Sequence, residues 1–327
     1  MAEIINRRRN IFINSEQYHN SQGDVKLIFP GNDFAVDKNE RMRLSLETFA
    51  MTRNFYSVNS YNNTFYVRES TTKTIIKELT ITPGDYSSFA KLATGIKTDL
   101  ESIYGTGLVG VSYNDTTRKL EIDMTSATGW NNDHEFVCFQ VTDKSARPAN
   151  VTSNGAFNDS CEILGGRPSK SFDETIPAFH KNNKVFTAYY PAALKTIKAV
   201  HMRTNLQTHS YSTPNFDAHS ESSMLIPSDI LAKIVIPPND FFGGSTVFSF
   251  QDSGSSAFSV DLQNKTLPDI TIKLTDDKGR PLPAQPNQNA DGNMSYLATL
   301  KWVALASPMI GKETGMPRPD LQMKLYQ

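Results

Sequence analysis

The sequence predicts a mainly β fold, a jelly-roll β-sandwich into which a small α+β domain of βαββ order is inserted. Aromatic residues make up 10 % of the 327 residues, with 19 Phe and 12 Tyr, and this composition favours pleated, half-buried sheet surfaces. Apolar and polar residues alternate along many short segments, as they do in strands with one buried face. One segment, residues 86–104, has a clear helical periodicity.

The length and charge of the chain limit the kinds of partner that it can have. A chain of 327 residues with 38 % hydrophobic residues can bury two modest cores, so we expect two structural units. The formal net charge is −1, which predicts no overall field toward nucleic acid or a membrane surface. The apolar run 297–306 is interrupted by Thr299 and Lys301 and is shorter than the roughly 20 residues that span a bilayer.

The N-terminal residues predict an extended arm over residues 1–24. This region is polar except for Ile11, Phe12 and Ile13, which we expect to form one short anchoring strand. It also lacks the apolar core of a secretory signal, so we expect a protein that stays inside the cell or assembles there. Three arginines in the arm, Arg7, Arg8 and Arg9, could neutralise phosphates of packaged nucleic acid. Three charges are few, and we expect a solvated arm or a contact with an acidic neighbour instead.

The sandwich is predicted from residues 25–60 and 185–327. In the segment 41–51, for example, Met42, Leu44 and Leu46 alternate with polar residues, which predicts one buried face. Short strands separated by Pro and Gly turns are typical of a sandwich or jelly roll. The expected strands of the sandwich are 25–30, 41–51, 185–190, 196–204, 230–236, 247–250, 258–262, 270–274 and 296–304, and a further strand at 64–68 falls in the inserted domain.

The inserted domain is predicted at residues 61–184, with its βαββ unit at 74–124. A strand at 75–82 is stopped by Pro83-Gly84, after which Asp85 or Ser87 can cap the helix 86–104. Apolar residues recur along this helix at spacings of three and four, so we expect one stripe to pack against the three strands of the unit. Two more strands, 109–113 and 120–124, flank a polar turn. The remaining stretch, 125–184, is rich in loop residues, with one strand at 135–141.

Residues 105–110 match the glycine fingerprint of dinucleotide-binding proteins. That fingerprint binds phosphate when its glycines lead from a strand into the N-terminus of a helix. Here a helix comes first and a strand follows, so the glycines are expected to end the helix. We therefore expect no cofactor.

The remaining chemically active residues predict no enzyme. His201, His209, Asp217 and His219 have spacings of no compact metal motif, and we expect them to be polar loop residues between two strands. No Gly-x-Ser-x-Gly nucleophile motif is present. The acidic pair at 276–277 precedes Lys278-Gly279, as in a tight turn. The two cysteines, Cys138 and Cys161, are expected to be buried free thiols. No residue is assigned to a catalytic, metal or cofactor site.

Five stretches, taken in order, resemble the penton and related single-jelly-roll vertex proteins of virophages, polinton-like viruses and their large double-stranded DNA virus relatives. They are IFINS at 11–15, TITPGDYS at 80–87, EILGG at 162–166, ILAKIVI at 230–236 and ITIKLTDDKGRPL at 270–282. The resemblance implies a capsid protein of the virion that forms homopentamers at icosahedral vertices and adjoins the major capsid protein. Its outward insertion domain would carry any receptor or spike contact.

The resemblance also suggests a role for the N-terminal arm as a contact between subunits. The candidate contact residues are Arg7, Arg8, Arg9, Ile11, Phe12 and Ile13. Two alternatives remain open: a minor capsid or spike protein of the same virion, and a carbohydrate-binding β-sandwich, which the abundance of aromatic and amide side chains in predicted loops would suit.

Overall fold

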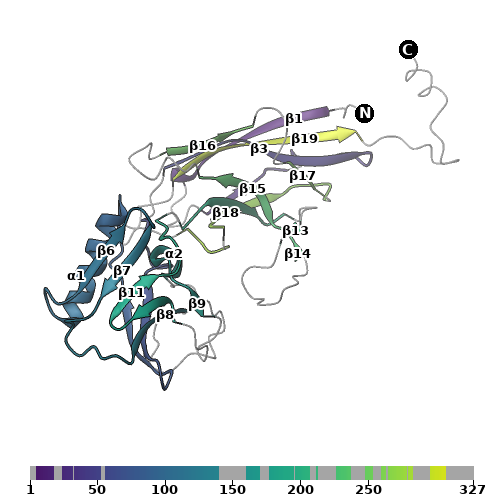
Figure 1. Cartoon of the computed structure of the whole chain (residues 1–327). Coiled ribbons are helices and arrows are strands. Elements are labelled where there is room, and N and C mark those ends of the chain that lie inside the picture. Colours follow the sequence, from purple (N-terminus) through teal and green to yellow (C-terminus); the bar gives the residue numbers. More distant parts are fainter. Residues whose placement is uncertain are drawn as a thin grey trace, which may run out of the picture.

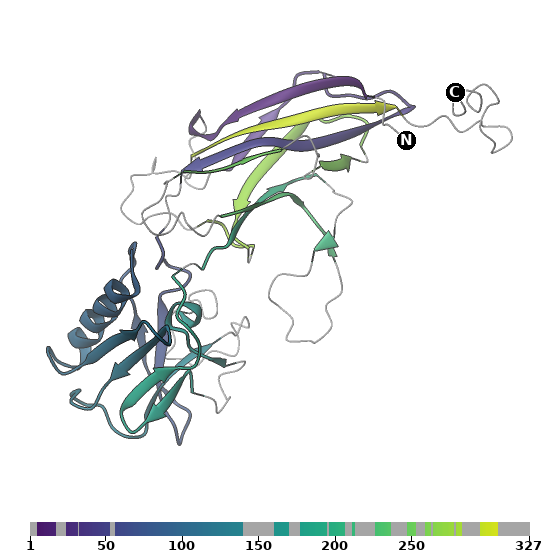
Figure 2. The same ribbon diagram turned by 45° about the horizontal axis from the view of Figure 1, so that its top comes forward.

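The structure is a computed structural model with two lobes, a β-sandwich and a second lobe that contains the long helix (Figures 1 and 2). It describes residues 5–17, 24–31, 33–52, 56–139, 160–169, 177–194, 196–206, 211–212, 226–236, 247–252, 259–262, 264–277, 279–282 and 295–306.

The first sheet of the sandwich is antiparallel and has the strand order β1-β19-β3-β16, with β17 paired to the first part of β3. Its longest strand, β3, is in register with β19 along most of its length, with one bulge between Thr299 and Leu300. The strands are β1 (Ile5–Asn14), β3 (Glu40–Thr52), β16 (Val247–Gln251), β17 (Ser259–Leu262) and β19 (Tyr296–Ala306). A short 3-10 turn, η1 (Ser15–Gln17), follows β1.

The second sheet faces the first and has the order β15-β12-β18-β2. Its strands are β2 (Val25–Ile28), β12 (Ala199–Thr204), β15 (Ile230–Val235) and β18 (Asp269–Thr275). With β16 and β17 counted as one strand, the first strand of the sandwich pairs with the eighth, the second with the seventh, the third with the sixth and the fourth with the fifth. This is the pairing of a jelly roll, and the predicted jelly-roll β-sandwich is confirmed.

One hydrophobic core lies between the two sheets. The predicted inward residues of β3 are all buried, because alternate side chains of a strand point to the same face. Trp302 is fully buried in this core, and the ring of Tyr296 stacks on Phe49 with centroids 5.6 Å apart. Each fully buried side chain of this size contributes about 1.5–3 kcal/mol, so the alternation of β3 and β19 contributes strongly to the stability of this lobe.

The second lobe lies between β3 and β12 in the sequence and has a hydrophobic core of its own, with residues from Val58 to Leu194. It contains two sheets, ordered β5-β4-β8-β9 and β10-β11-β7-β6. Its strands are β4 (Thr64–Glu69), β5 (Ile75–Thr80), β6 (Gly110–Asn114), β7 (Lys119–Asp123), β8 (His134–Phe139), β9 (Pro168–Ser169), β10 (Phe179–Asn182) and β11 (Val185–Ala188); its helices are α1 (Phe89–Tyr104) and α2 (Cys161–Leu164). A short hairpin, β13 (Tyr211–Ser212) with β14 (Ile226–Pro227), belongs to the chain after β12.

Helix α1 begins three residues later than predicted. Ser88 caps it, rather than Asp85 or Ser87, since the Ser88 hydroxyl accepts a hydrogen bond from the Lys91 N–H at 3.2 Å. The buried residues Leu92, Ala93, Ile96 and Leu100 form the predicted apolar stripe. The helix ends where the Gly105 N–H donates to the Glu101 carbonyl, with Gly105 at φ 105°, a conformation that favours glycine.

The predicted βαββ order is present, but its three strands do not form one sheet. The strand before the helix, β5, pairs with β4, whereas β6 and β7 pair with each other and then with β11. The short turn at 70–74 joins β4 and β5 as a hairpin. Strands joined by such a short connection commonly pair with each other. Helix α1 makes its closest backbone contacts with β6, and its apolar stripe shares one core with Leu79 of β5 and Ile122 of β7.

The predicted boundary between the units at residues 184 and 185 falls inside a hairpin. Strand β11 was expected to begin the second part of the sandwich, but it pairs with β10 and β7, and Phe186 and Ala188 are buried in the second core. Asn183, at φ 55°, forms the turn with Lys184, and asparagine tolerates this left-handed conformation. The short β10–β11 connection holds both strands in the second lobe.

The predicted N-terminal arm is wrong for residues 5–14. These residues form the ten-residue strand β1, which pairs with β19 along its whole length. The expected strand at 11–13 is therefore only its last part. Residues 1–4 and 18–23, also assigned to the arm, lie outside the described residues.

Polar contacts join the two lobes. The Arg280 guanidinium donates to Asp276 Oδ2 at 2.7 Å and to the Tyr61 carbonyl at 3.3 Å, and it lies over the Tyr61 ring, 4.6 Å from the centroid. Nearby, Asn62 Nδ2 donates to Thr196 Oγ1 at 2.9 Å. Asp276 also accepts a hydrogen bond from the Arg280 backbone N–H, so the predicted turn role of this acid is confirmed.

Candidate functional site

The histidine-rich cluster is only partly described. His201 lies in β12, within the expected strand 196–204 and not in the loop between strands to which its cluster was assigned, and it is paired with Lys233 of β15 and Thr275 of β18. Burial, and then the positive charges of Arg203 and Lys233, lower the pKa of His201. His209, Asp217 and His219 lie outside the described residues. In the part of the chain that is described, no three His, Cys, Asp or Glu side chains could together hold a metal ion.

The glycine fingerprint ends the helix, as predicted. Beyond the Gly105 cap, the Gly107 N–H donates to Glu101 Oε1 at 2.9 Å, and β6 starts at Gly110. The glycines thus lie at the C-terminus of α1, where a helix presents carbonyls rather than the N–H groups that bind phosphate.

Both cysteines are free thiols; Cys138 is buried, whereas Cys161 is only half-buried. Within the described ranges, no helix is long and apolar enough to cross a membrane.

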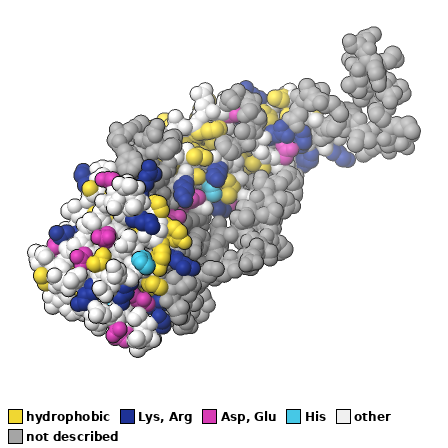
Figure 3. All heavy atoms as spheres, viewed as in Figure 1, with side chains coloured by type: hydrophobic (Ala, Val, Ile, Leu, Met, Phe, Trp, Pro, Cys, Tyr) yellow, Lys and Arg dark blue, Asp and Glu magenta, His cyan; other side chains and the backbone are white. Residues whose placement is uncertain are grey.

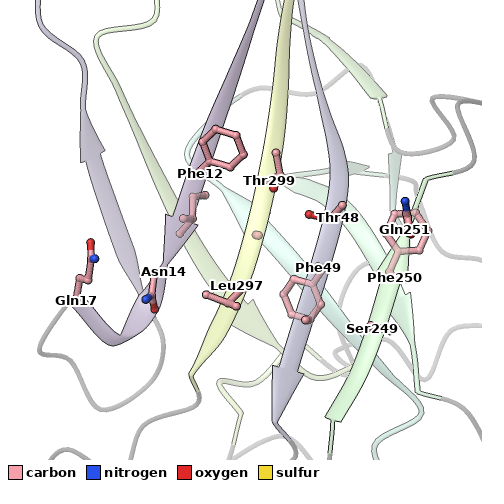
Figure 4. Close-up of a pocket in the computed structure, with 13 residues that line it drawn as sticks. Phe12, Asn14, Gln17, Thr48, Phe49, Ser249, Phe250, Gln251, Leu297 and Thr299 are labelled. Carbon is pink, nitrogen blue, oxygen red and sulfur yellow. The ribbon is translucent and has the colours of Figure 1, made fainter.

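The outer face of the first sandwich sheet has a continuous uncharged region, which we call the Phe12 face. Cross-strand pairing sets its residues in two rows over four strands (Figure 4). The first row contains Phe12, Thr299, Thr48 and Gln251, and the second contains Asn14, Leu297, Ala50 and Ser249. These residues line a shallow hollow of about 610 Å³, and none of its thirteen lining residues is charged.

Phe12 and Leu297 make this face apolar. Phe12 is 78 % exposed, although its neighbours Ile11 and Ile13 are 8 % and 3 % exposed, and Leu297 is 55 % exposed. The alternation of β1 turns Ile11 and Ile13 into the core and Phe12 outward. An exposed apolar patch of this kind is typical of an interaction surface.

The other half of the same outer face carries charges that pair across strands. Arg43 Nε lies 2.6 Å from Asp261 Oδ1, and Arg41 reaches the other oxygen of the same carboxylate at 3.2 Å. Arg8 lies 2.8 Å from Glu47. Such partly exposed pairs contribute little to stability, about 0–1 kcal/mol each. Basic and acidic side chains are also interspersed over the face drawn in Figure 3.

Arg7 and Arg9 close the far end of the core. The Arg7 guanidinium lies 6.0 Å from the Trp302 ring centroid, and Arg9 lies 5.5 Å from that of Phe34. Their charges meet carboxylates, Arg7 with Glu40 at 2.6 Å and Arg9 with Asp33 at 3.7 Å. Long cationic side chains commonly cover apolar surface in this way.

Glu40 is held ionised at this end of the sheet. The Asp37 backbone N–H donates to its carboxylate, as do the side chains of Asn6 and Arg7, and together they lower the pKa of Glu40 to about 2. Hydrogen bonds to the charged form of a carboxylate stabilise that form. The arginine triplet thus has acidic partners within the chain.

Strand β1 is also an edge of its sheet. Among the described residues it pairs with β19 alone, so one side of its backbone has no strand beside it there. Ile5, at its start, is exposed, as is Phe12 near its end. Unpaired edge strands are templates for pairing with another strand. The edge of β1 and the Phe12 face are adjacent and form the candidate functional site.

The sequence found only part of this site. Of the six predicted contact residues, Phe12 lies on the uncharged face, Arg8 lies on the charged half, and Ile11 and Ile13 are buried. Leu297 and Thr299 were missed as surface residues, although the alternation of segment 296–304 contains the signal for them. The contributions of Thr48 and Gln251 depend on strand register, which the sequence does not give.

Comparison with known proteins finds similarity in solved structures. No model of a known protein family matches the chain, and no curated protein matches its sequence. One similar structure is the mavirus penton protein, with 14 % identity, coverage of 91 % of this chain and 98 % of that chain, and a TM-score of 0.42. Another is from the Sputnik virophage, with 14 % identity, coverage of 93 % and 99 %, and a TM-score of 0.38.

One of these structures is a penton protein, and the other comes from a virophage. At 14 % identity and with TM-scores below 0.5, neither similarity assigns a function to this chain.

Proposed function

We propose that this chain is a structural capsid protein, five copies of which form the penton at each vertex of an icosahedral double-stranded DNA virus. The observation that carries the proposal is the jelly roll whose outer sheet face has an uncharged hollow around exposed Phe12. The five sequence stretches that resemble vertex proteins support the same conclusion. In this proposed role the chain is not an enzyme, and it lies in the virion beside the major capsid protein.

The two lobes would have different tasks in such a particle. The sandwich would make the contacts of the ring. The second lobe, inserted between β3 and β12, would be the outward insertion domain predicted at 61–184, with bounds widened to include its core from Val58 to Leu194. A receptor or a spike would bind this lobe.

Ring closure requires one heterologous interface repeated five times. The Phe12 face and the adjacent side chains of β1 would form one side of it. A stable interface of this kind buries more than about 1,000 Å² in total. The exposed Phe12 side chain would contribute about 1.5–3 kcal/mol on burial, and truncation of such an aromatic anchor often has a large effect.

Substituting Phe12 by Asp tests this interface. We expect the Phe12→Asp variant to remain folded, because this side chain is exposed, and to lose assembly, because a carboxylate would be buried without a partner. The matched control is Ile76→Asp, at an exposed apolar residue of β5 in the second lobe, which should assemble like the natural chain. Light scattering after size-exclusion chromatography measures the mass of each. Equal assembly of both variants would exclude the Phe12 face as the interface.

Electron microscopy of particles that contain the chain separates the proposed role from its closest alternative. Density for the chain at the five-fold axes is the expected result. Density elsewhere on the shell would instead support a minor capsid or spike protein.

A further inference from the structure

The open edge of β1 is long enough to accept another strand. It has ten residues, or roughly 33 Å at about 3.3 Å per residue. Within the described ranges β19 is its only neighbour. The added strand would lie next to the side chains of Ile11 and Ile13 on the core face and next to Phe12 on the outer face.

The chain itself contains a segment with the pattern of such a strand. In residues 321–327, Leu321, Met323 and Leu325 alternate with Gln322, Lys324 and Tyr326, which is typical of a strand with one apolar face. This segment lies outside the described residues. Its apolar side suits the core edge beside Ile11 and Ile13, and its polar side, with one aromatic ring, suits the Phe12 side.

The spacer before this segment can reach a neighbouring copy. The last described residue, Ala306, ends β19 beside the start of β1, at the end of the sandwich away from the second lobe (Figures 1 and 2). Residues 307–320 number fourteen and span up to about 46 Å when extended, more than the length of β1. Pro317 and Pro319 favour an extended chain just before residue 321.

The direction of the strands favours a segment from a neighbouring copy over the segment of the same copy. A chain that leaves β19 there and returns along its own β1 would run parallel to β1, because β1 and β19 are antiparallel. Parallel pairing is slightly less stable per residue than antiparallel pairing. A segment from another copy has no such constraint.

We propose that residues 321–327 of one copy add a strand to the open edge of β1 in the next copy. The inference rests on the proposed function, since it requires neighbouring copies. We place Tyr326 beside Phe12. In either strand direction this register sets Leu325 beside Ile11 or Ile13 and Lys324 beside Asn10 or Asn14, so that no lysine faces an arginine.

Mixed disulfide formation tests the proposed pairing. Chains with Phe12→Cys are assembled with chains that carry Tyr326→Cys and are mildly oxidised. Directly opposed strand residues lie within the Cα separation that a disulfide allows. We expect a covalent product of twice the 36.4 kDa chain mass. The control pair, Phe12→Cys with Gln322→Cys, is displaced by four residues, or about 13 Å, and should give only the background of each single variant and of the natural chain.

Hydrogen exchange gives a second measurement on the whole assembled chain. An added strand protects amides of β1, so peptides that cover residues 5–14 should exchange roughly tenfold faster in a Met323→Ser/Leu325→Ser variant, equivalent to about 1.4 kcal/mol. The control Gln322→Ser should leave this exchange unchanged, because it alters the polar side.

Native mass measurement of the same samples separates the two proposals. If the natural chain is pentameric but the variants give neither the mixed disulfide nor the change in hydrogen exchange, strand addition is wrong and the proposed function stands. A chain can also carry both Phe12→Cys and Tyr326→Cys. If a disulfide forms only within such a chain, strand addition between copies is wrong. A natural chain that remains monomeric would overturn both proposals.

Discussion

Replacing Arg68 by Met should lower the free energy of unfolding of the second lobe by about 3 kcal/mol. Arg68 in β4 and Glu135 in β8 are paired residues of neighbouring strands, and Arg68 Nε lies 2.6 Å from Glu135 Oε1. Their side chains are 0 % and 6 % exposed. Removing one partner of a buried ion pair typically costs about 3–5 kcal/mol, because the other charge is left without compensation in a desolvated site.

The expected value lies at the lower end of that range because a second cation remains. Lys73 Nζ lies 3.8 Å from the same Glu135 oxygen and would still offset part of the carboxylate charge. In the double variant Arg68→Met/Glu135→Leu no buried charge of this pair is left. Its stability should therefore lie within about 1 kcal/mol of the natural protein, since apolar replacements of similar volume are often neutral.

The two tryptophans of the chain allow each lobe to be followed separately. Trp130 lies in the second core and Trp302 in the sandwich core. In a Trp302→Phe background, the fluorescence of Trp130 during urea unfolding reports on the second lobe, and linear extrapolation gives the free energy. The control is Arg8→Met, which breaks the exposed pair with Glu47 and should cost less than about 1 kcal/mol, measured with Trp302.

Two results would refute this reasoning. The first is a cost of Arg68→Met no larger than that of Arg8→Met, since burial would then not decide the energy of the pair. The second is a double variant less stable than either single variant, which would mean that the charges stabilise the lobe beyond compensating each other.

Two further predictions concern pH and backbone conformation. The lowered pKa of Glu40, about 2 against an ordinary 4.5, stabilises the folded sandwich fully above pH 4.5, and this contribution is lost as the pH falls toward 2. Glu40→Gln should therefore be less stable than the natural chain at pH 7, with a difference that shrinks below pH 4.5; a difference independent of pH, measured by urea unfolding, would contradict this. Gly165 has φ 67°, and an added Cβ would lie 2.2 Å from the Tyr190 carbonyl oxygen. Gly165→Ala should thus cost clearly more than Gly107→Ala, where φ is 75° but no atom lies within 4 Å and only the left-handed strain of about 1–2 kcal/mol applies; equal melting temperatures of the two variants would be inconsistent with a clash.

Local patterns of the sequence predicted most strands and the long helix. The alternation of Met42, Leu44 and Leu46 placed the buried face of β3 correctly, because period-two burial is a local property. The position of Gly105 after the apolar stripe likewise predicted the end of α1. These features depend on residues only a few positions apart.

Pairing between distant strands could not be predicted in the same way. Nothing near Val185 in the sequence indicates that β11 joins β7 rather than the sandwich, since both places would bury Phe186. Similarly, the sequence alone suggests that Arg7 and Arg9 are solvated. In the structure they lie over the rings of Trp302 and Phe34. Contacts between residues so far apart in the sequence depend on the assembled fold.

The candidate site shows the same division. The sequence singled out Phe12 within an apolar triplet, and the structure separates its exposed ring from the buried Ile11 and Ile13. The residues that complete the Phe12 face come from β3, β16 and β19, which lie far apart in the sequence. Their assembly into one uncharged face is a consequence of the jelly-roll strand order.

The most direct test of the proposed function is the mass of the purified natural chain by native mass spectrometry at micromolar concentration. A capsid protein that closes five-fold vertices should be observed as five copies of the 36.4 kDa chain, about 182 kDa. A single species at 36.4 kDa, with no larger assembly, would contradict the proposal.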